Sequence, residues 1–547
     1  MNYTTYAVLV AFSRTVFVYP VLGVAAGSLA GMTLNFALSR RFVFTVGYAG
    51  NSRLPAPSAQ SFSRVRVVSA VLLALAVLSY ALWLRGRHFH FLMHGHGFGL
   101  TFNSMLEHLL GGEFDVDPRT VGLEGFRRDG HVVAYWGIFC ALIRLPLVLI
   151  PGGLTRDVTC LSCLVAVILA AGTKLLTLQL VHDSTPPSTA RHVLYWSLVA
   201  AVLFSGAQIE FLRPTLYQEV CLWAGALAAG FVYFAVRGIV RGTFSAAALC
   251  VMGVLAGLAL LTRVSMGIGL YTALALLLIV ILIQSVWQGA STGPEAKSKP
   301  SLALLWRQFL APALVLLVFA MLVGLVNYGR WGDPLVFADY RSYLMNALYP
   351  DRLARTEAYG LFNLERVPFG LVYYFLPIWV LVRGDGQLLF EEHQRRLMDA
   401  TELPPSSFFL TDPLLILVCV YAAWALLSLR RSSGVNRLHV LAIAAGLGAA
   451  CLLMLSAISM TFRYRIEFYP LMEFGAFLGF FLLCRSRLAT ISLRAVSTAV
   501  IASASLGILA SHAVLVLYKT SYFGPPIDLL RRGVVAYYLE RIHSHWL

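Results

Sequence analysis

The chain has 547 residues, of which 59% are hydrophobic and only 12% are charged, and its formal net charge is +16. Soluble domains contain roughly 25% charged residues, so this composition excludes a soluble fold. The basic residues lie in short loops between apolar runs, which favours membrane topology over a nucleic-acid partner as the source of the positive charge.

Apolar runs of spanning length recur along the whole chain. A helix needs about 20 such residues to cross the hydrocarbon core, because every backbone amide must be bonded internally there. About 12–14 runs of this kind are present, so the sequence predicts an all-α, polytopic membrane protein with about 12–14 transmembrane helices and extracytoplasmic loops.

The N-terminal part forms a separate segment. Residues 1–45 contain one and a half to two apolar runs and end in NFALSRRFVF, and residues 46–66 form a basic linker. Residues 39–66 carry five arginines and no acid, so the positive-inside rule places them in the cytoplasm. The main membrane module is predicted to cover residues 67–547.

The first run of this module, 67–84, delivers residues 85–131 to the extracytoplasmic side. Residues 100–110 have helical periodicity and predict an amphipathic helix on the membrane surface, which stops at Gly111 and Gly112. A cluster of carboxylates follows, formed by Glu113, Asp115, Asp117 and Glu124.

A carboxylate near a low-dielectric boundary can act as a general base or bind a divalent cation. Asp115 and Asp117 are the candidate catalytic bases, and Glu124 is a candidate substrate-binding residue. A divalent cation is a possible cofactor, and the sequence does not identify its ligands. The alternative is a solvated acidic loop whose charges pair with Arg119, Arg127 and Arg128.

The next runs alternate across the membrane, with one exception. Further spans are predicted near 158–181, 193–210, 216–236, 244–261 and 264–283. The basic stretch 288–307 reads as a cytoplasmic loop, so the number of crossings requires one run to turn back. Residues 132–151, interrupted by Arg144 and Pro146, are predicted to be re-entrant or a half-helix.

The run 308–326 leads into a second extracytoplasmic segment, 327–411. Within it, the short apolar piece 367–382 is predicted to be re-entrant or interfacial. The last spans are predicted at 412–429, 438–459, 467–484 and 492–517, with basic loops on the cytoplasmic side. With this topology, 16 of the 26 acids lie in the two extracytoplasmic segments, so acid–base chemistry is expected there.

Three further positions have residue types suited to substrate binding. Tyr217 and Glu219 stand at a helix start, where an acid can also simply complement the helix dipole. Arg263 lies between two apolar runs and either faces a polar cavity or occupies a turn.

The segment MTFRYRIEFYP carries Arg463, Tyr464 and Arg465 directly before a helix. Guanidinium groups at headgroup depth can bind a lipid phosphate with two parallel hydrogen bonds. Arginines that merely anchor a helix at the membrane surface have a similar pattern, so both readings remain open.

Two family resemblances rest on these residues. NFALSRRFVF, Asn35 to Phe44, resembles the end of GtrA-like proteins, which are linked to the movement of polyprenyl-phosphate-linked sugars; the match makes residues 1–45 a partial GtrA-like segment. Residues 67–547 resemble the GT-C superfamily of polytopic glycosyltransferases. This second likeness rests on the acidic first outer loop, Tyr217, Glu219, Arg263, NYGRWGDP (Asn327 to Pro334) and FRYRIEFYP (Phe462 to Pro470).

Many GT-C members place an acid directly after the first helix of the module, whereas here RGRHFHFLMHGHGFG contains none and the acids arrive about 25 residues later. The resemblance implies transfer of a sugar from a polyprenyl-phosphate donor to a glycan or lipid acceptor at the extracytoplasmic face of a cell membrane, with a bacterial inner membrane as the expected location. Asp115 or Asp117 would deprotonate the acceptor, while Arg463 and Arg465 hold the donor phosphate. The alternative is a lipid-linked sugar translocator or a non-catalytic carrier-binding protein.

Overall fold

The computed structural model describes residues 59–85, 93–94, 97–291, 306–377, 396–398, 401–402, 406–428, 435–485, 493–521, 523–525 and 533–546. The predicted GtrA-like segment, residues 1–45, lies outside the described residues, as does the linker up to residue 58.

The predicted all-α polytopic class is confirmed. Within the described residues, nine helical stretches are long and apolar enough to cross a membrane, and three apolar helical stretches are shorter. The long helices are α4 (Ala59–Arg85), α8 (Thr159–Asp183), α9 (Thr189–Phe204) continued by α10 (Gly206–Ile209), α11 (Leu216–Arg241), α13 (Val264–Ser291), α15 (Ala311–Trp331), α21 (Arg437–Ser456), α22 (Tyr469–Arg485) and α23 (Leu493–Thr520). Shorter apolar helices are α12 (Ala246–Leu260) and α20 (Pro413–Ser428).

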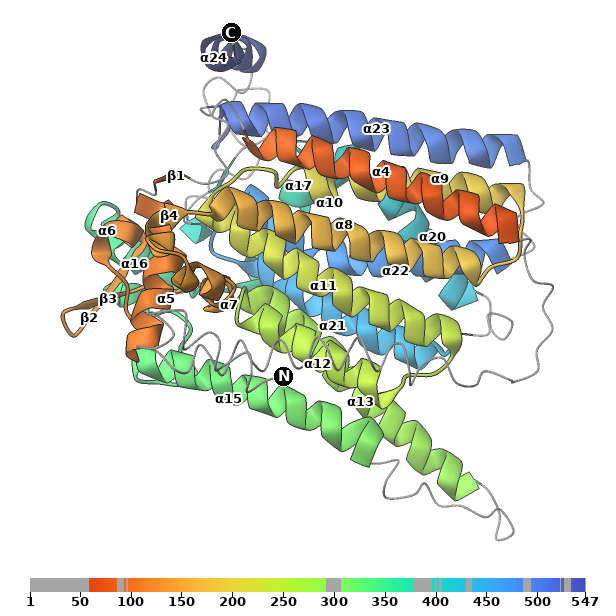
Figure 1. The fold of residues 1–547 in the computed structure, drawn as a ribbon, viewed down its shortest axis with the longest axis horizontal. Coiled ribbons are helices and arrows are strands. Elements are labelled where there is room, and N and C mark those ends of the chain that lie inside the picture. The colour runs from red at the N-terminus through yellow and green to blue at the C-terminus, as the bar shows by residue number, and fades with distance from the viewer. Residues whose placement is uncertain are drawn as a thin grey trace.

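The long helices run side by side, and smaller elements gather at one end of the bundle, on the left in Figure 1. These are α5 (Thr101–Gly111), α6 (Pro118–Val121), α7 (Phe139–Leu142) and α16 (Pro350–Tyr359). Two short antiparallel pairs join them, β1 (Met93–His94) with β4 (Arg156–Asp157), and β2 (Phe126–Arg128) with β3 (His131–Val133). We call this the loop end of the bundle. Two other short helices, α17 (Val367–Phe375) and α19 (Phe408–Thr411), belong to the second outer segment, and the C-terminal α24 (Val534–Trp546) lies beyond the end of α23, at the top of the picture.

Residues 132–151 do not form a spanning helix. They contain α7 and a 3-10 turn at Leu145–Leu149, and the chain both leaves α4 and enters α8 at the loop end (Figure 1). The chain therefore turns back here without a spanning helix, as the count of crossings predicted. Pro146 explains the shortness of the helical pieces, because a proline lacks the backbone donor that a continuing helix requires.

The predicted surface helix at 100–110 is present as α5, but its predicted location was wrong. Residues 101–106 are all buried in the protein rather than lying on a membrane surface. Asn103 explains the burial, because its amide donates to the backbone oxygens of Leu154 and Arg156, each at 2.8 Å. The helix ends as predicted, with Gly112 in the left-handed region at φ 84°.

The first helix of the main module begins earlier than the predicted apolar run 67–84. Helix α4 begins at Ala59, so the end of the predicted linker, residues 59–66, already belongs to the first helix. Arg66 in this extension lies 3.8 Å from Asp183 at the end of α8. The polar residues were read as linker because hydropathy alone marks the apolar part of a helix and misses its polar ends.

The two predicted outer segments pack against each other at the loop end. Phe126 of β2 stacks on Tyr343 of the second segment with ring centroids 4.6 Å apart, and it meets Trp331 edge to face at 5.4 Å. Phe126 and Tyr343 are also joined by an isolated antiparallel bridge. Residues more than 200 positions apart thus form one small aromatic core, which we call the Phe126 cluster.

Helices α13 and α21 approach each other closely at Gly446. A Cβ atom added there would lie 2.1 Å from the backbone nitrogen of Ala273, whereas one added at Gly448 on the same helix would meet nothing within 4 Å. Small residues permit such backbone contact between membrane helices.

The Gly446→Ala variant is therefore expected to lower the free energy of unfolding by about 1–3 kcal/mol, since the obstructing atom is backbone and cannot turn away. Thermal or denaturant unfolding in detergent measures this loss. Gly448→Ala is the matched control and should leave stability unchanged or slightly raised, because alanine favours a helix more than glycine does. Equal losses in both variants would contradict the close contact.

Candidate functional site

A polar cavity of about 170 Å³ opens at the loop end between three distant parts of the chain. It is lined by Glu124 of the first outer segment and Tyr135 just after β3, by Tyr340, Tyr343, Arg352, Thr356, Leu361 and Phe362 of the second outer segment, and by Met454, Ala457, Ile458, Ser459, Arg463 and Tyr464 at the end of α21 and in the α21–α22 connection. We call it the Arg463 cavity. It brings a carboxylate, two guanidinium groups and several phenols around one space.

Arg463 is held in place by aromatic rings and an acid. Its guanidinium carbon lies 4.3 Å from the ring centroid of Tyr217 and 5.5 Å from that of Tyr464. One of its terminal nitrogens is 3.5 Å from a carboxylate oxygen of Glu402. The side chain is 15% exposed, so it is largely desolvated yet still reaches the cavity. A cation over aromatic faces in such a site interacts strongly with an incoming anion.

Glu124 lines the same cavity from the first outer segment. It follows α6 in a 3-10 turn, Gly122–Glu124, just before β2. The Tyr343 hydroxyl donates a 2.7 Å hydrogen bond to Oε2 of Glu124. Burial raises the pKa of the Tyr343 phenol and the neighbouring carboxylate raises it further, so the phenol stays protonated and remains a donor. Glu124 thus has one oxygen engaged by Tyr343.

Arg263 lies behind the cavity wall, where it contacts Tyr464. Arg263 forms an ion pair with Glu467, and its guanidinium carbon lies 5.1 Å from the ring centroid of Tyr464. Ser265 donates to the same Glu467 carboxylate at 2.6 Å. Arg263 therefore orients Tyr464, which lines the cavity, while its own charge is neutralised by Glu467.

A second cavity of about 400 Å³ lies nearby and includes Tyr217 in its wall. Its other lining residues are Phe98, Gly99, Asp157, Thr159, Arg213, Pro214, Thr215, Leu216 and Phe523. We call it the Asp157 cavity. Asp157 accepts a 2.8 Å hydrogen bond from the Thr159 amide, and Gly99 sits so close that a Cβ there would clash with the Asp157 carboxylate.

The candidate bases Asp115 and Asp117 are not among the described residues that line either cavity. Asp117 caps α6 by accepting the Arg119 amide at 2.9 Å. Asp115 contacts two histidine rings, His108 at 2.6 Å and His131 at 2.8 Å. Burial favours the neutral form of Asp115, but the hydrogen bonds from His131 and His108 outweigh it and lower its pKa, while the hydrogen bond to Asp115 raises the pKa of His131.

Glu219 lies in a fully buried ion pair rather than in a cavity wall. Its two carboxylate oxygens accept from the two terminal nitrogens of Arg144 at 2.7 and 2.9 Å. Arg144 also donates to the Asn103 side chain at 2.8 Å and to the Cys140 carbonyl at 2.6 Å. This arrangement ties the re-entrant piece and α5 to α11.

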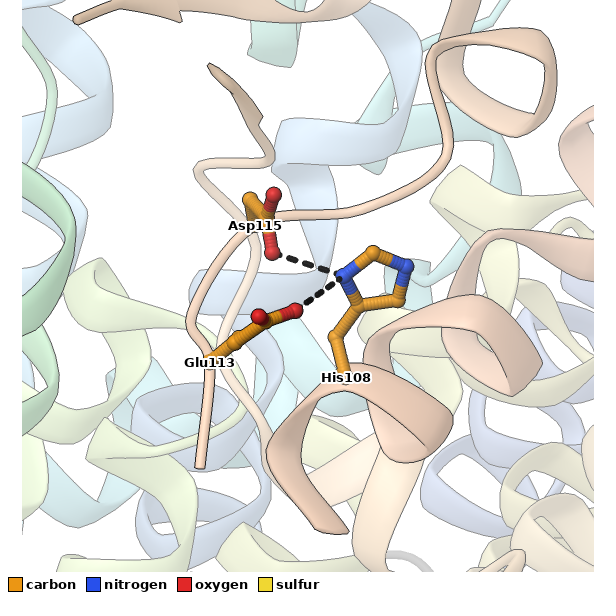
Figure 2. Close-up of side chains that lie close together, drawn as sticks. All are labelled: His108, Glu113 and Asp115. Atoms are coloured by element: carbon orange, nitrogen blue, oxygen red, sulfur yellow. Dashed lines mark hydrogen bonds and ion pairs between the residues drawn. The ribbon is translucent and has the colours of Figure 1, made fainter. Parts of the chain in front are cut away.

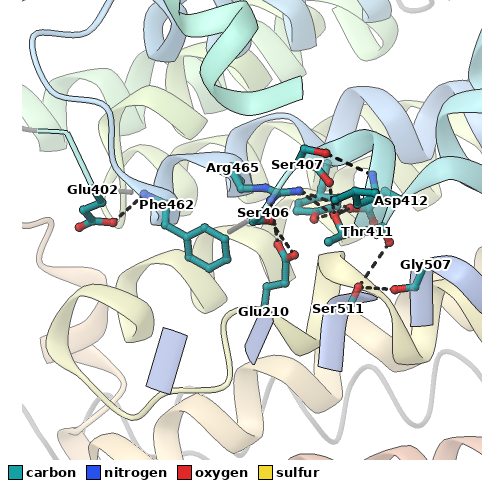
Figure 3. Close-up of polar contacts among 12 residues, drawn as sticks. Glu210, Glu402, Ser406, Ser407, Thr411, Asp412, Phe462, Arg465, Gly507 and Ser511 are labelled. Atoms are coloured by element: carbon teal, nitrogen blue, oxygen red, sulfur yellow. Dashed lines mark hydrogen bonds and ion pairs between the residues drawn. The ribbon is translucent and has the colours of Figure 1, made fainter. Parts of the chain in front are cut away.

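Arg465 does not line the Arg463 cavity but points toward Glu210, Ser406 and Asp412, as Figure 3 shows. It lies 3.4 Å from Glu210 and 3.7 Å from Asp412, and it donates to Thr411 at 2.8 Å and to Ser406. The side chain is 2% exposed. The alternation of Arg463, Tyr464 and Arg465 explains the divergence, because neighbouring residues in a tight helical turn face different directions.

The structure therefore brings together Glu124, Arg463 and Tyr464 around one cavity, with Tyr217 and Arg263 directly behind them. The sequence analysis did not single out Asp157, Arg213, Tyr343 or Arg352. Asp157 lies two residues before α8 and Arg213 three residues before α11, so a position just before a helix at the loop end was the available signal. Tyr343 and Arg352 gave none, because only the fold places the second outer segment over the first.

Comparison with known proteins gives distant structural likenesses. No family model matches the chain, and no curated protein matches its sequence. Its structure is similar to an oligosaccharyltransferase, AglB from Archaeoglobus fulgidus in complex with an inhibitory peptide and a dolichol-phosphate, at 13% identity and a TM-score of 0.42, covering 82% of this chain and 55% of that one. It is also similar to ArnT from Cupriavidus metallidurans bound to undecaprenyl phosphate, at 13% identity and a TM-score of 0.38, covering 85% and 77%. The chain spans about half the length of the oligosaccharyltransferase.

Proposed function

We propose that this protein transfers a sugar from a polyprenyl-phosphate donor to a hydroxyl group of a glycan or lipid acceptor at the extracytoplasmic face of the membrane. The observation that carries the proposal is the Arg463 cavity, where the carboxylate of Glu124 and the guanidinium groups of Arg463 and Arg352 surround one space. The first residue can accept a proton, and the other two can bind an anionic leaving group.

The reaction follows from these two roles. Glu124 accepts the proton of the acceptor hydroxyl while the oxygen of that hydroxyl attacks the anomeric carbon of the sugar. The new glycosidic bond forms as the bond from that carbon to the phosphate oxygen breaks, and the electron pair leaves with the polyprenyl phosphate. Arg463 stabilises the charge that develops on the phosphate, and its desolvated position strengthens this interaction.

The proposed face of the membrane rests on charge. The short connections at the opposite end of the bundle carry basic residues and few acids, such as Arg237 and Arg241 at the end of α11, whereas 16 of the 26 acids belong to the outer segments at the loop end (Figure 1). By the positive-inside rule the loop end is extracytoplasmic. A bacterial inner membrane is the proposed location because such carriers and acceptors meet there in the cell envelope.

Arg463 is expected to dominate donor binding. We expect Arg463→Met to weaken binding of undecaprenyl phosphate by about 10- to 100-fold, since a charge-assisted hydrogen bond contributes about 1.5–3 kcal/mol. Binding is measured on the full chain in detergent. Arg119→Met is the control, because Arg119 is an exposed arginine at the same end that lines neither cavity. Equal affinities of the wild type and Arg463→Met would contradict the assignment.

One product distinguishes sugar transfer from translocation, namely free polyprenyl phosphate. Incubation of the reconstituted protein with a labelled polyprenyl-phosphate hexose and cell-envelope acceptors should release free polyprenyl phosphate and label the acceptor. A translocator moves the donor intact. Appearance of the donor in the opposite leaflet with no broken sugar–phosphate bond would therefore replace the proposed activity with translocation.

A further inference from the structure

Three metal-ligating side chains meet where α5 ends, outside both cavities. Figure 2 shows His108, Glu113 and Asp115 directed toward one another. The Nδ1 atom of His108 lies 2.6 Å from Asp115 and 3.5 Å from Glu113, and the donor atoms of all three residues lie within 4.8 Å of one another. The sequence analysis allowed a divalent cation at this acidic loop but did not identify its ligands and gave His108 no role.

A fourth ligand comes from the β2–β3 hairpin. The Nδ1 atom of His131, at the start of β3, lies 2.8 Å from the second carboxylate oxygen of Asp115. Asp115 thus stands between two imidazoles, each presenting the same ring nitrogen. The set contains two imidazoles and two carboxylates, which is a combination suited to zinc and related transition metals rather than to the all-oxygen sites of calcium or magnesium.

The backbone holds these groups close before any ion arrives. The left-handed Gly112 reverses the chain after α5, and the Glu113 amide donates to the His108 carbonyl at 2.9 Å. Ligand atoms around a tetrahedral zinc ion are about 3.3 Å apart, given bond lengths near 2.0 Å. His108, Glu113 and Asp115 have ligand atoms within 4.8 Å of one another, so these three can close around an ion by small side-chain movements. His131, which is 66% exposed, contacts only Asp115 among the three and turns toward the ion to complete the set.

We propose that His108, Glu113, Asp115 and His131 form a structural zinc site. The ion would link the end of α5 to the β2–β3 hairpin. The same hairpin carries Phe126, the centre of the Phe126 cluster, which joins the two outer segments. The ion therefore stabilises the position of the β2–β3 hairpin at the loop end. This inference does not depend on sugar transfer, because none of the four residues lines the Arg463 cavity.

The test measures zinc on the purified full chain. After treatment with a chelator, the protein in detergent is incubated with zinc chloride, desalted and assayed for metal by elemental analysis, and its thermal unfolding is followed with and without zinc. We expect roughly one zinc ion per chain and a higher unfolding temperature with zinc. Asp115→Asn and His131→Gln should each lose this zinc and the temperature shift.

Asp129→Asn is the matched control. Asp129 lies on the same hairpin, is 83% exposed and is not one of the four ligands, so its variant should bind zinc like the wild type. His131 is 66% exposed, so its replacement leaves the fold intact even if Asp115→Asn does not. Wild-type protein that retains no zinc would overturn the proposal. Retention of the same zinc by Asp115→Asn and His131→Gln would also do so, since the ion would then be held by other histidines of the chain.

Discussion

The Glu124→Gln variant is expected to lose about 100- to 10,000-fold in kcat for sugar transfer, with little change in donor affinity. Glutamine keeps the size of the side chain and can still accept the 2.7 Å hydrogen bond from Tyr343, so the cavity retains its shape. It cannot accept the proton of an attacking hydroxyl. A loss confined to kcat is therefore the signature of a missing base rather than of a distorted site.

Variants of two further carboxylates are compared with Glu124→Gln. Asp117→Asn should retain activity, because Asp117 caps α6 and lines neither cavity. Asp157→Asn tests the larger cavity, where Asp157 is the carboxylate in the wall. If Asp157→Asn abolishes turnover while Glu124→Gln remains active, the reacting groups meet in the Asp157 cavity and our assignment of the base is wrong.

The Glu219→Ala variant is expected to lower the free energy of unfolding by about 3–5 kcal/mol. It leaves the guanidinium of Arg144, which is 2% exposed, without its carboxylate in the interior of the protein. Unfolding in detergent measures the loss. The matched control is Glu357→Ala, which removes the partner of Arg341 in an ion pair whose side chains are 54% and 77% exposed. Such a surface pair contributes about 0–1 kcal/mol.

A double variant separates a structural role of Glu219 from substrate binding. Replacing both charges, as in Arg144→Met with Glu219→Met, removes the uncompensated ion and should recover most of the lost stability. Activity should return with stability if Glu219 acts only through Arg144. A stable but inactive double variant would instead show that the sequence-based assignment of Glu219 to the substrate is correct.

The helices could be predicted because a single physical constraint defines them. The run predicted at 158–181 is α8 at Thr159–Asp183, and the run at 438–459 is α21 at Arg437–Ser456. The end of α8 at Asp183 and the start of α21 at Arg437 coincide with a change between apolar and polar residues. Counting membrane crossings also predicted that residues 132–151 turn back, because the basic loops must all lie on the same side of the membrane.

The site was harder to predict, because it depends on contacts between distant segments. Whether Glu124 or Asp115 faces a cavity depends on where the 3-10 turn at Gly122–Glu124 directs a side chain, and sequence spacing does not determine that. Arg463 and Arg465 looked equivalent in sequence, yet one reaches a cavity and the other lies between Glu210 and Asp412 (Figure 3). The buried acids that hold Arg465 lie 53 or more positions away from it in the chain.

Tyr217 belongs to the wall of the larger cavity and also lies against the guanidinium of Arg463 in the smaller one. A ligand that displaces this ring from one side changes the support of the arginine on the other. Such a ligand would couple the occupancy of the two cavities, and by thermodynamic linkage the coupling would be reciprocal. If one cavity receives the donor and the other the acceptor, a movement of this one phenol ring makes the affinity for each substrate depend on the presence of the other.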